Sequence, residues 1–193
     1  KEELKTFSAF NTRLIGHPNN KVPGVEMNTG SLGHGLSVGS GIALAGKKDK
    51  LDYRTFVLMG DGEQAEGSIW EGAMFASHYK LDNLCGIIDR NKLQISGQTE
   101  IIMSIEPLAD KWRAFGWNVL EINGNSMEEI IKALSIEAII KDKPTLIIAN
   151  TIKGKGLLCA ENNPSWHHKV PTDLEYKQAM FDLDQMLGCV LNE

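Results

Sequence analysis

The stretch that decides the fold is TFVLMGDGE, residues Thr55–Glu63. Its first five residues, Thr55–Met59, carry no charge and are followed by a glycine, a pattern typical of a buried parallel strand. Similar short runs recur downstream at Leu84–Asp89, Val119–Ile122 and Thr145–Ala149. The sequence therefore predicts strands at these four runs, with the motif Gly-Asp-Gly at the end of the first.

Helical patterns separate the predicted strands. Ser68–Lys80 places apolar side chains near one another at helical spacing. Ser126, with a glutamate three residues later, has the pattern of a capping box, and we expect its helix to include Ile139 and to end at Pro144. Asp173–Leu187 predicts a further amphipathic helix. This alternation favours an α/β fold, a doubly wound, mostly parallel sheet with helices on both faces.

The domain organisation is simple in sequence terms. The chain shows no internal repeat, no low-complexity tract and no linker, so we expect residues 1–193 to form a single domain. It opens with Lys1 instead of an initiator Met, and it lacks the layout of a signal peptide. We therefore expect this domain to lack its first N-terminal residues.

Composition excludes several classes of function. With 20 Lys and Arg against 25 Asp and Glu, the net charge is −5, whereas chains that neutralise nucleic-acid phosphates are usually basic. No apolar run approaches the ~20 residues that span a bilayer, so we expect no membrane partner. The three cysteines form no CxxC pair, which favours a reducing compartment, and we expect a cytoplasmic location.

Oxygen ligands follow two of the predicted strands. Asp61 stands between two glycines directly after the first strand, and Asn91 follows the second. Ligands bind at the carboxyl ends of strands in such sheets, and Mg²⁺ prefers oxygen ligands with only partial coordination by protein. Together with one backbone carbonyl and a diphosphate, these side chains predict a Mg²⁺ site (or a Ca²⁺ or Mn²⁺ site). The alternative interpretation is that Gly-Asp-Gly is only a turn.

Longer strings resemble a known family. GDG, 28 residues and then Asn is similar to the motif by which thiamine enzymes hold a divalent cation on the cofactor's diphosphate. The string from Gly60 to Gly97, with GHPNNKVPGVEMNTGSLGHGL, TIKGKG and SWHHKVP, specifically resembles transketolase, and in particular its diphosphate-binding domain. The resemblance implies thiamine diphosphate as cofactor and transfer of a two-carbon ketol unit from a ketose phosphate to an aldose phosphate.

The resemblance also implies roles for residues around the cofactor. Asp61, Asn91 and the carbonyl of Leu93 match metal ligands of the family, and Gly62 matches a backbone contact to the diphosphate. A loop beside the thiazolium ring is matched by three consecutive residues, Gly30, Ser31 and Leu32.

Four further residues match positions at the substrate and partner sides of that site. Lys153 matches a residue near the cofactor, and His167 matches a histidine that contacts both cofactor and substrate. His17 matches a histidine of the substrate channel, so His17 and His167 are the candidate catalytic residues. Glu66 resembles a carboxylate that links the two cofactor sites of the dimer. A lone lysine such as Lys153 is otherwise most often a solvated surface charge.

Other residues depart from the family pattern or have a simpler interpretation. His34 replaces a more usual glutamine and His168 a more usual glycine, which leaves their roles open. The tryptophans at positions 70, 112 and 117 are interpreted as core or interface residues. The glycines at positions 33, 35, 39 and 41 do not fit G-x-G-x-x-G, and they predict close helix packing instead of a dinucleotide site.

The resemblance implies a partner. In the family, the glutamate that activates the cofactor lies on a pyrimidine domain, and nothing in these 193 residues matches that domain. The chain is therefore expected to need a pyrimidine-domain transketolase subunit or domain, as a homodimer or heterotetramer, with sugar phosphates as substrates. A split N-terminal subunit and a fragment of a full-length enzyme both fit this expectation.

Three alternatives remain at the level of sequence. One is another thiamine diphosphate enzyme, such as one like 1-deoxyxylulose-phosphate synthase or a 2-oxoacid dehydrogenase subunit, although the GSLGHG and TIKGKG strings argue against both. Another is a non-catalytic paralogue that binds the cofactor. The third, a nucleotide-binding α/β protein, is disfavoured because the sequence has no P-loop.

Overall fold

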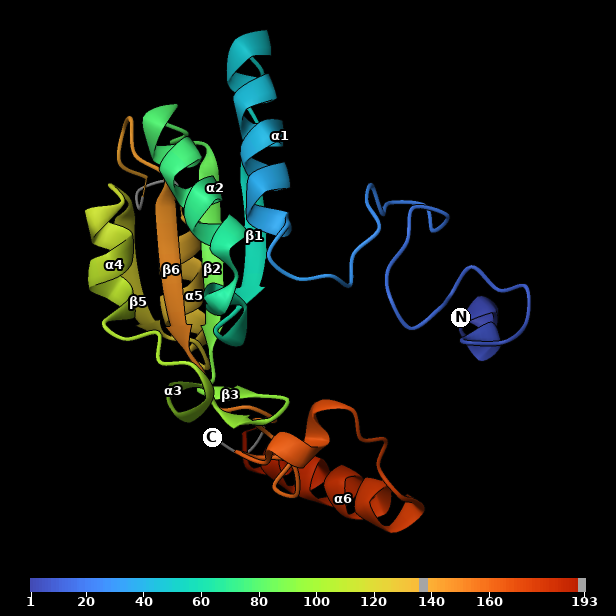
Figure 1. The fold of residues 1–193 in the computed structure, drawn as a ribbon. Helices are drawn as coiled ribbons and strands as arrows, with labels where there is room; N and C mark the ends of the chain where they lie inside the picture. Colours follow the sequence, from blue (N-terminus) through green and yellow to red (C-terminus); the bar gives the residue numbers. More distant parts are fainter. Residues whose placement is uncertain (136–138, 191–193) are drawn as a thin grey trace.

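A parallel sheet forms the centre of the computed structural model, which describes residues 1–135 and 139–190. Among those residues, four strands make up this sheet in the spatial order β1-β2-β6-β5 (Figure 1). The strands are β1 Thr55–Gly60, β2 Leu84–Arg90, β5 Asn118–Asn123 and β6 Thr145–Asn150. The strand predictions are confirmed, with each strand one to two residues longer than its apolar run.

The register of the strands brings their carboxyl ends to one edge. Gly60 of β1 pairs with Asp89 of β2, and Asp89 pairs with Ala149 of β6, which in turn pairs with Ile122 of β5. All these pairs are parallel, so whatever follows each strand emerges at the same edge of the sheet.

Helices cover both faces of the sheet, which confirms the predicted α/β architecture. On one face lie α1 Gly35–Asp49, α2 Gly67–His78 and α4 Leu108–Ala114, and on the other lies α5 Met127–Leu134 (Figure 1). Side chains of β6 alternate between two apolar clusters: Leu146 and Ile148 pack towards the first face, and Ile147 packs towards α5. This alternation is the period of two expected for a strand buried on both faces.

The predicted tryptophans belong to the larger of these clusters. Trp112 and Trp117 are buried, and their rings make an edge-to-face contact with centroids 4.8 Å apart. Trp70 packs against Trp112 at 5.4 Å. Their interpretation as core residues is therefore confirmed.

Helix α1 approaches β1 closely at one glycine. A Cβ atom on Gly39 would lie 2.4 Å from Cγ2 of Val57, whereas one on Gly35 would make an ordinary contact of 3.5 Å with the same side chain. A Cβ atom on Gly41 would meet open space, and Gly33 lies before the helix with a positive φ of 88°. Close helix packing therefore accounts for Gly39 but not for all four glycines.

The helix that begins after Ser126 is shorter than predicted. It ends at Leu134, so the expectation that it includes Ile139 and ends at Pro144 is wrong. The reason is that side chains satisfy its last carbonyl groups: Arg54 donates to the Leu134 carbonyl at 2.8 Å, and the Ser135 hydroxyl donates to that of Lys132 at 2.8 Å.

At the start of the same helix, only one of the two hydrogen bonds of a capping box is present. The Ser126 hydroxyl accepts from Glu129 N at 3.3 Å, as predicted. The Glu129 carboxylate, however, accepts from Asn123 N at 2.8 Å instead of from Ser126 N. The glutamate therefore joins the helix to the end of β5.

The remaining elements lie outside the central sheet and the helices that cover it. They are η1 Glu2–Thr6, η2 Gly62–Ala65, β3 Leu93–Gln94, β4 Gly97–Gln98, α3 Thr99–Ile102, η4 Pro164–His167 and α6 Asp173–Val190. Figure 1 shows the first 34 residues extending away from the sheet, and α6 lying beyond its carboxyl edge. The predicted C-terminal helix is confirmed, and no helix in the described part of the chain is long and apolar enough to cross a membrane.

Several large apolar side chains remain exposed. Phe56 and Leu58, on the α5 side of β1, are 48% and 73% exposed, whereas α5 packs mainly against β5 and β6. On α6, Leu174 and Phe181 are exposed as well. The described residues alone therefore leave an apolar surface of the kind that marks protein–protein contact.

Candidate cofactor site

Asp61 is buried where β1 ends, with only 1% of its surface exposed. One carboxylate oxygen, Oδ1, accepts from Gly62 N at 2.8 Å, which caps the short helix η2. The other oxygen, Oδ2, accepts from Lys92 N at 2.6 Å and from Arg90 Nη1 at 3.0 Å. The carboxylate therefore joins the end of β1 to the chain that leaves β2.

Asn91 lies in the chain between Arg90 and Lys92, which both donate to Oδ2 of Asp61. Its Oδ1 accepts from Leu93 N at 2.9 Å, and its Nδ2 donates to Asp89 Oδ2 at 3.1 Å. The amide group is thus held in one orientation by the turn that leads into β3. The structure brings Asp61, Asn91 and Leu93, the three predicted metal ligands, to the ends of two neighbouring strands.

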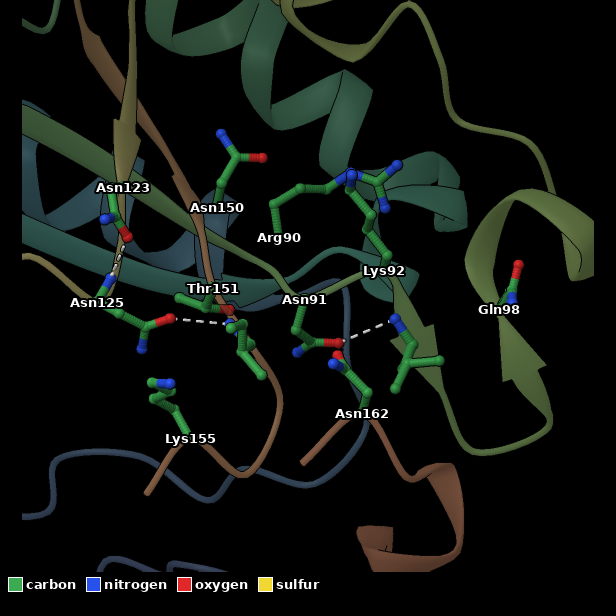
Figure 2. A pocket seen from close by; sticks show the side chains of 12 residues that line it. Arg90, Asn91, Lys92, Gln98, Asn123, Asn125, Asn150, Thr151, Lys155 and Asn162 are labelled. Carbon is green, nitrogen blue, oxygen red and sulfur yellow. Dashed lines mark hydrogen bonds between the residues drawn. The ribbon is translucent and has the colours of Figure 1, made fainter. Parts of the chain in front are cut away.

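A cavity of about 750 Å³ opens at the same edge of the sheet (Figure 2). Amide side chains dominate its lining, namely Asn91, Gln98, Asn123, Asn125, Asn150 and Asn162. Lys92 and Lys155 also line it, and no Asp or Glu does so among the described residues. Asp61 is not in the lining, although its hydrogen-bond partners Arg90 and Lys92 are. The cavity is therefore suited to a polar, anionic group.

The donor set at the end of β1 and β2 fits a hard divalent cation. A carboxylate has about four acceptor positions, and Asp61 uses three of them, two on Oδ2 and one on Oδ1. The amide oxygen of Asn91 likewise uses one of two. Each therefore keeps one acceptor position for an ion that prefers oxygen. In the described part of the chain, no three His, Cys, Asp or Glu side chains are grouped as a metal site, so further ligands must be amide, carbonyl or ligand oxygens.

Gly62 contributes space at this site. Its N–H group already donates to Asp61, so in this structure it is not free to make the predicted backbone contact to a diphosphate. A Cβ atom at this position would lie 3.1 Å from Cβ of Gln94 on β3. A glycine therefore lets the hairpin of β3 and β4 pack closely against the turn after β1.

The predicted loop of Gly30, Ser31 and Leu32 is exposed and leads into α1. Gly30 has a positive φ of 144°, and a Cβ atom there would lie 2.7 Å from the His17 ring. The structure thus brings His17 and Gly30 together, although both are exposed. The neighbouring Gly33 lies against Glu66, whose Cβ would be 2.8 Å from a Cβ atom at that position.

Glu63 ties this loop to the end of β1. It is 8% exposed, and its carboxylate accepts from Gly33 N at 2.8 Å and from Gly60 N at 3.0 Å. Sequence reasoning gave Glu63 no role. The buried bridge connects a loop and a strand that are about thirty residues apart, so no local pattern marks it.

Lys153 and His167 lie near each other in the segment that follows β6. Burial lowers the pKa of His167, and the positive charges of Lys153 and His168 lower it further. The two histidine rings stand edge to face at 4.6 Å. Helix η4, which carries His167, packs against β3, which carries Leu93. The candidate catalytic histidine therefore lies at the same edge of the sheet as the predicted metal ligands.

Arg90 is a second residue that sequence reasoning missed. Its side chain is 3% exposed and makes ion pairs with Asp61, Glu100 and Glu106. Only its position at the end of a strand, beside Asn91, could have drawn attention to it. Asn123 and Asn150 carry the same signal, because each ends a strand and lines the cavity.

Comparison with known proteins agrees with this geometry. Residues 1–180 match the family model described as "Transketolase, thiamine diphosphate binding domain". The chain belongs to this family. Its fold is also that of a solved transketolase from Campylobacter jejuni, with a TM-score of 0.89 and 35% identity over 95% of this chain and 30% of that one.

Relatives in the family include separate subunits. The chain is 54% identical over 187 residues to an apulose-4-phosphate transketolase subunit of Phocaeicola vulgatus, covering 97% of this chain and 66% of that protein. It is 42% identical over 185 residues to a 6-deoxy-6-sulfo-D-fructose transketolase subunit of a Clostridium species, covering 95% and 67%. The chain thus spans about two thirds of these subunits, and under a third of the solved transketolase.

Proposed function

We propose that this chain supplies the diphosphate-binding half of a split transketolase and acts with a second chain that carries the pyrimidine domain. The observation that supports the proposal most is the hydrogen bonding of buried Asp61, at the end of β1, to Arg90 and Lys92 on either side of Asn91. A carboxylate and an amide are thereby held at adjacent strand ends. The relatives named as transketolase subunits, and the exposed apolar side chains, favour a partner chain.

In this proposal the chain's own residues hold and orient the cofactor. Asp61, Asn91 and the Leu93 carbonyl would hold a divalent cation that neutralises the diphosphate, and the amide-lined cavity would accommodate polar groups beside it. When bound, thiamine diphosphate supplies a nucleophilic carbon and an electron sink for breaking the bond next to a ketone.

His167 is the chain's candidate for proton transfer. Because its pKa is lowered from the ordinary value of about 6.5, His167 is mainly neutral at pH 7 and accepts a proton from a substrate hydroxyl. His17, on the loop near Gly30, is the second candidate, at the substrate side. The proposed substrates are a ketose phosphate donor and an aldose phosphate acceptor.

The test is reconstitution. The chain is mixed with a complementary pyrimidine-domain chain, thiamine diphosphate and Mg²⁺, and two-carbon transfer is followed by product analysis with a panel of ketose phosphates. We expect transfer only in the mixture. Saturable cofactor binding without transfer to any acceptor favours the non-catalytic paralogue, and absence of cofactor binding contradicts the proposal altogether.

A further inference from the structure

Arg90 makes four hydrogen bonds from a buried position at the end of β2. Its Nη1 donates to Asp61 Oδ2 at 3.0 Å and to Thr99 Oγ1 at 2.7 Å. Its Nη2 donates to Glu100 Oε1 and to Glu106 Oε1, both at 2.9 Å. Both terminal nitrogens of the planar guanidinium are therefore engaged, which fixes its orientation.

The partners of Arg90 are themselves held by the segment that follows β4. Glu100 Oε2 accepts from the Ser104 hydroxyl at 2.7 Å, and Glu106 Oε2 accepts from Leu108 N at 2.7 Å. Leu108 is in turn buried in the larger apolar cluster. A continuous chain of contacts therefore runs from that core through Arg90 to the Asp61 carboxylate.

The charges around Arg90 do not oppose a cation. One guanidinium faces three carboxylates, those of Asp61, Glu100 and Glu106, so the cluster as a whole is negative. Arg90 engages Oδ2 of Asp61 and makes no hydrogen bond to Oδ1, the oxygen that keeps an unused acceptor position.

We infer that Arg90 is a positioning residue for the divalent cation. It fixes the Asp61 carboxylate through Oδ2 and leaves the unused acceptor position of Oδ1 available to the ion that Asp61 would hold. This inference rests on the proposed function, in which Asp61 is a metal ligand. Partners that orient a metal ligand in this way typically contribute about 10–100-fold to metal affinity.

The test uses Arg90→Lys, which keeps the positive charge and removes the planar fork. Mg²⁺ is titrated calorimetrically into the chain with thiamine diphosphate, alone and with the complementary subunit, and thermal unfolding is measured without cofactor. We expect the dissociation constant for Mg²⁺ to rise about 10–100-fold. A purely structural role instead predicts a lower melting temperature with an unchanged dissociation constant, and that result overturns the inference.

Two further variants make the result unambiguous. Glu106→Gln changes a half-exposed partner of Arg90 without touching Asp61, and we expect a smaller rise in the same constant. If Arg90→Lys does not fold, an unchanged constant in Glu106→Gln overturns the inference. Arg113→Lys is the matched control, because Arg113 forms a similar fork with Asp110 and Glu121 away from the site, and it should bind Mg²⁺ normally.

The wild-type chain separates this inference from the function on which it rests. Wild type that shows no Mg²⁺-dependent cofactor binding, even with the complementary subunit, refutes the proposed function and this inference together. Wild type that binds, with an equal affinity in folded Arg90→Lys, refutes only the role of Arg90.

Discussion

Glu63 allows a quantitative prediction about the loop that leads into α1. Its buried carboxylate accepts two backbone hydrogen bonds, from Gly33 N at 2.8 Å and from Gly60 N at 3.0 Å. Glu63→Gln keeps the size of the side chain but replaces one acceptor oxygen by an NH₂ group. That group faces one of the two N–H donors, so one hydrogen bond is lost and its donor is left unpaired.

The cost follows from the kind of bond that is lost. A hydrogen bond to a charged group contributes about 1.5–3 kcal/mol, so Glu63→Gln should lower the free energy of unfolding by about 2 kcal/mol. For a chain of this size, each kcal/mol lowers the melting temperature by about 2–4 °C, which predicts a decrease of about 4–8 °C. Glu63→Ala removes both bonds and should cost about 3–6 kcal/mol.

Thermal and urea unfolding, followed by circular dichroism, measure these values. The matched control is Glu71→Gln on the exposed side of α2, which should change stability by no more than about 0.5 kcal/mol. Equal stability of Glu63→Gln and Glu71→Gln would refute the reasoning, because it would mean that the buried bridge contributes nothing.

Three further predictions concern packing, protonation and the pH dependence of stability. Gly39→Ala should lower the free energy of unfolding by about 1–2 kcal/mol, because overpacking against Val57 outweighs the gain in helix propensity. Gly41→Ala, where a Cβ atom meets open space, should raise the free energy of unfolding by about 0.5–1 kcal/mol. Urea denaturation compares the two variants, and stabilisation by both would contradict the packing argument. Lys153→Met should raise the pKa of His167 towards its ordinary value, measured by NMR titration, and an unchanged pKa would show that the two charges do not interact. The pKa of His167 is lower in the folded state than in the unfolded state, so the free energy of unfolding should increase as the pH rises from the folded pKa to the unfolded one. This increase should be smaller in Lys153→Met.

The strands and the meeting of Asp61 with the Asn91 turn could be predicted because both depend on short-range patterns. Short apolar runs bounded by glycine or polar residues favour buried strands, and neighbouring parallel strands end at one edge of the sheet. The position of a polar residue after each run is then enough to bring Asp61 close to the turn after β2. The same logic would have found Asn123 and Asn150.

The features that escaped prediction depend on contacts between distant segments. Helix α5 ends at Leu134 because Arg54, eighty residues earlier, donates to its last carbonyl group. Arg90 is buried among carboxylates only because the chain after β4 returns to the end of β2. Glu63 depends on the path of the loop around Gly33. None of these follows from periodicity or from spacing within one element.

The central claim is that Asp61 holds a cation on which cofactor binding depends. Calorimetry of thiamine diphosphate with wild type and with Asp61→Asn, each at saturating Mg²⁺ and again with a chelator, tests it most directly. We predict that wild type binds only with Mg²⁺, and that Asp61→Asn binds about 100-fold more weakly, a loss of about 2.7 kcal/mol. Equal affinity of the two folded proteins, or wild-type binding that ignores the chelator, would contradict the claim.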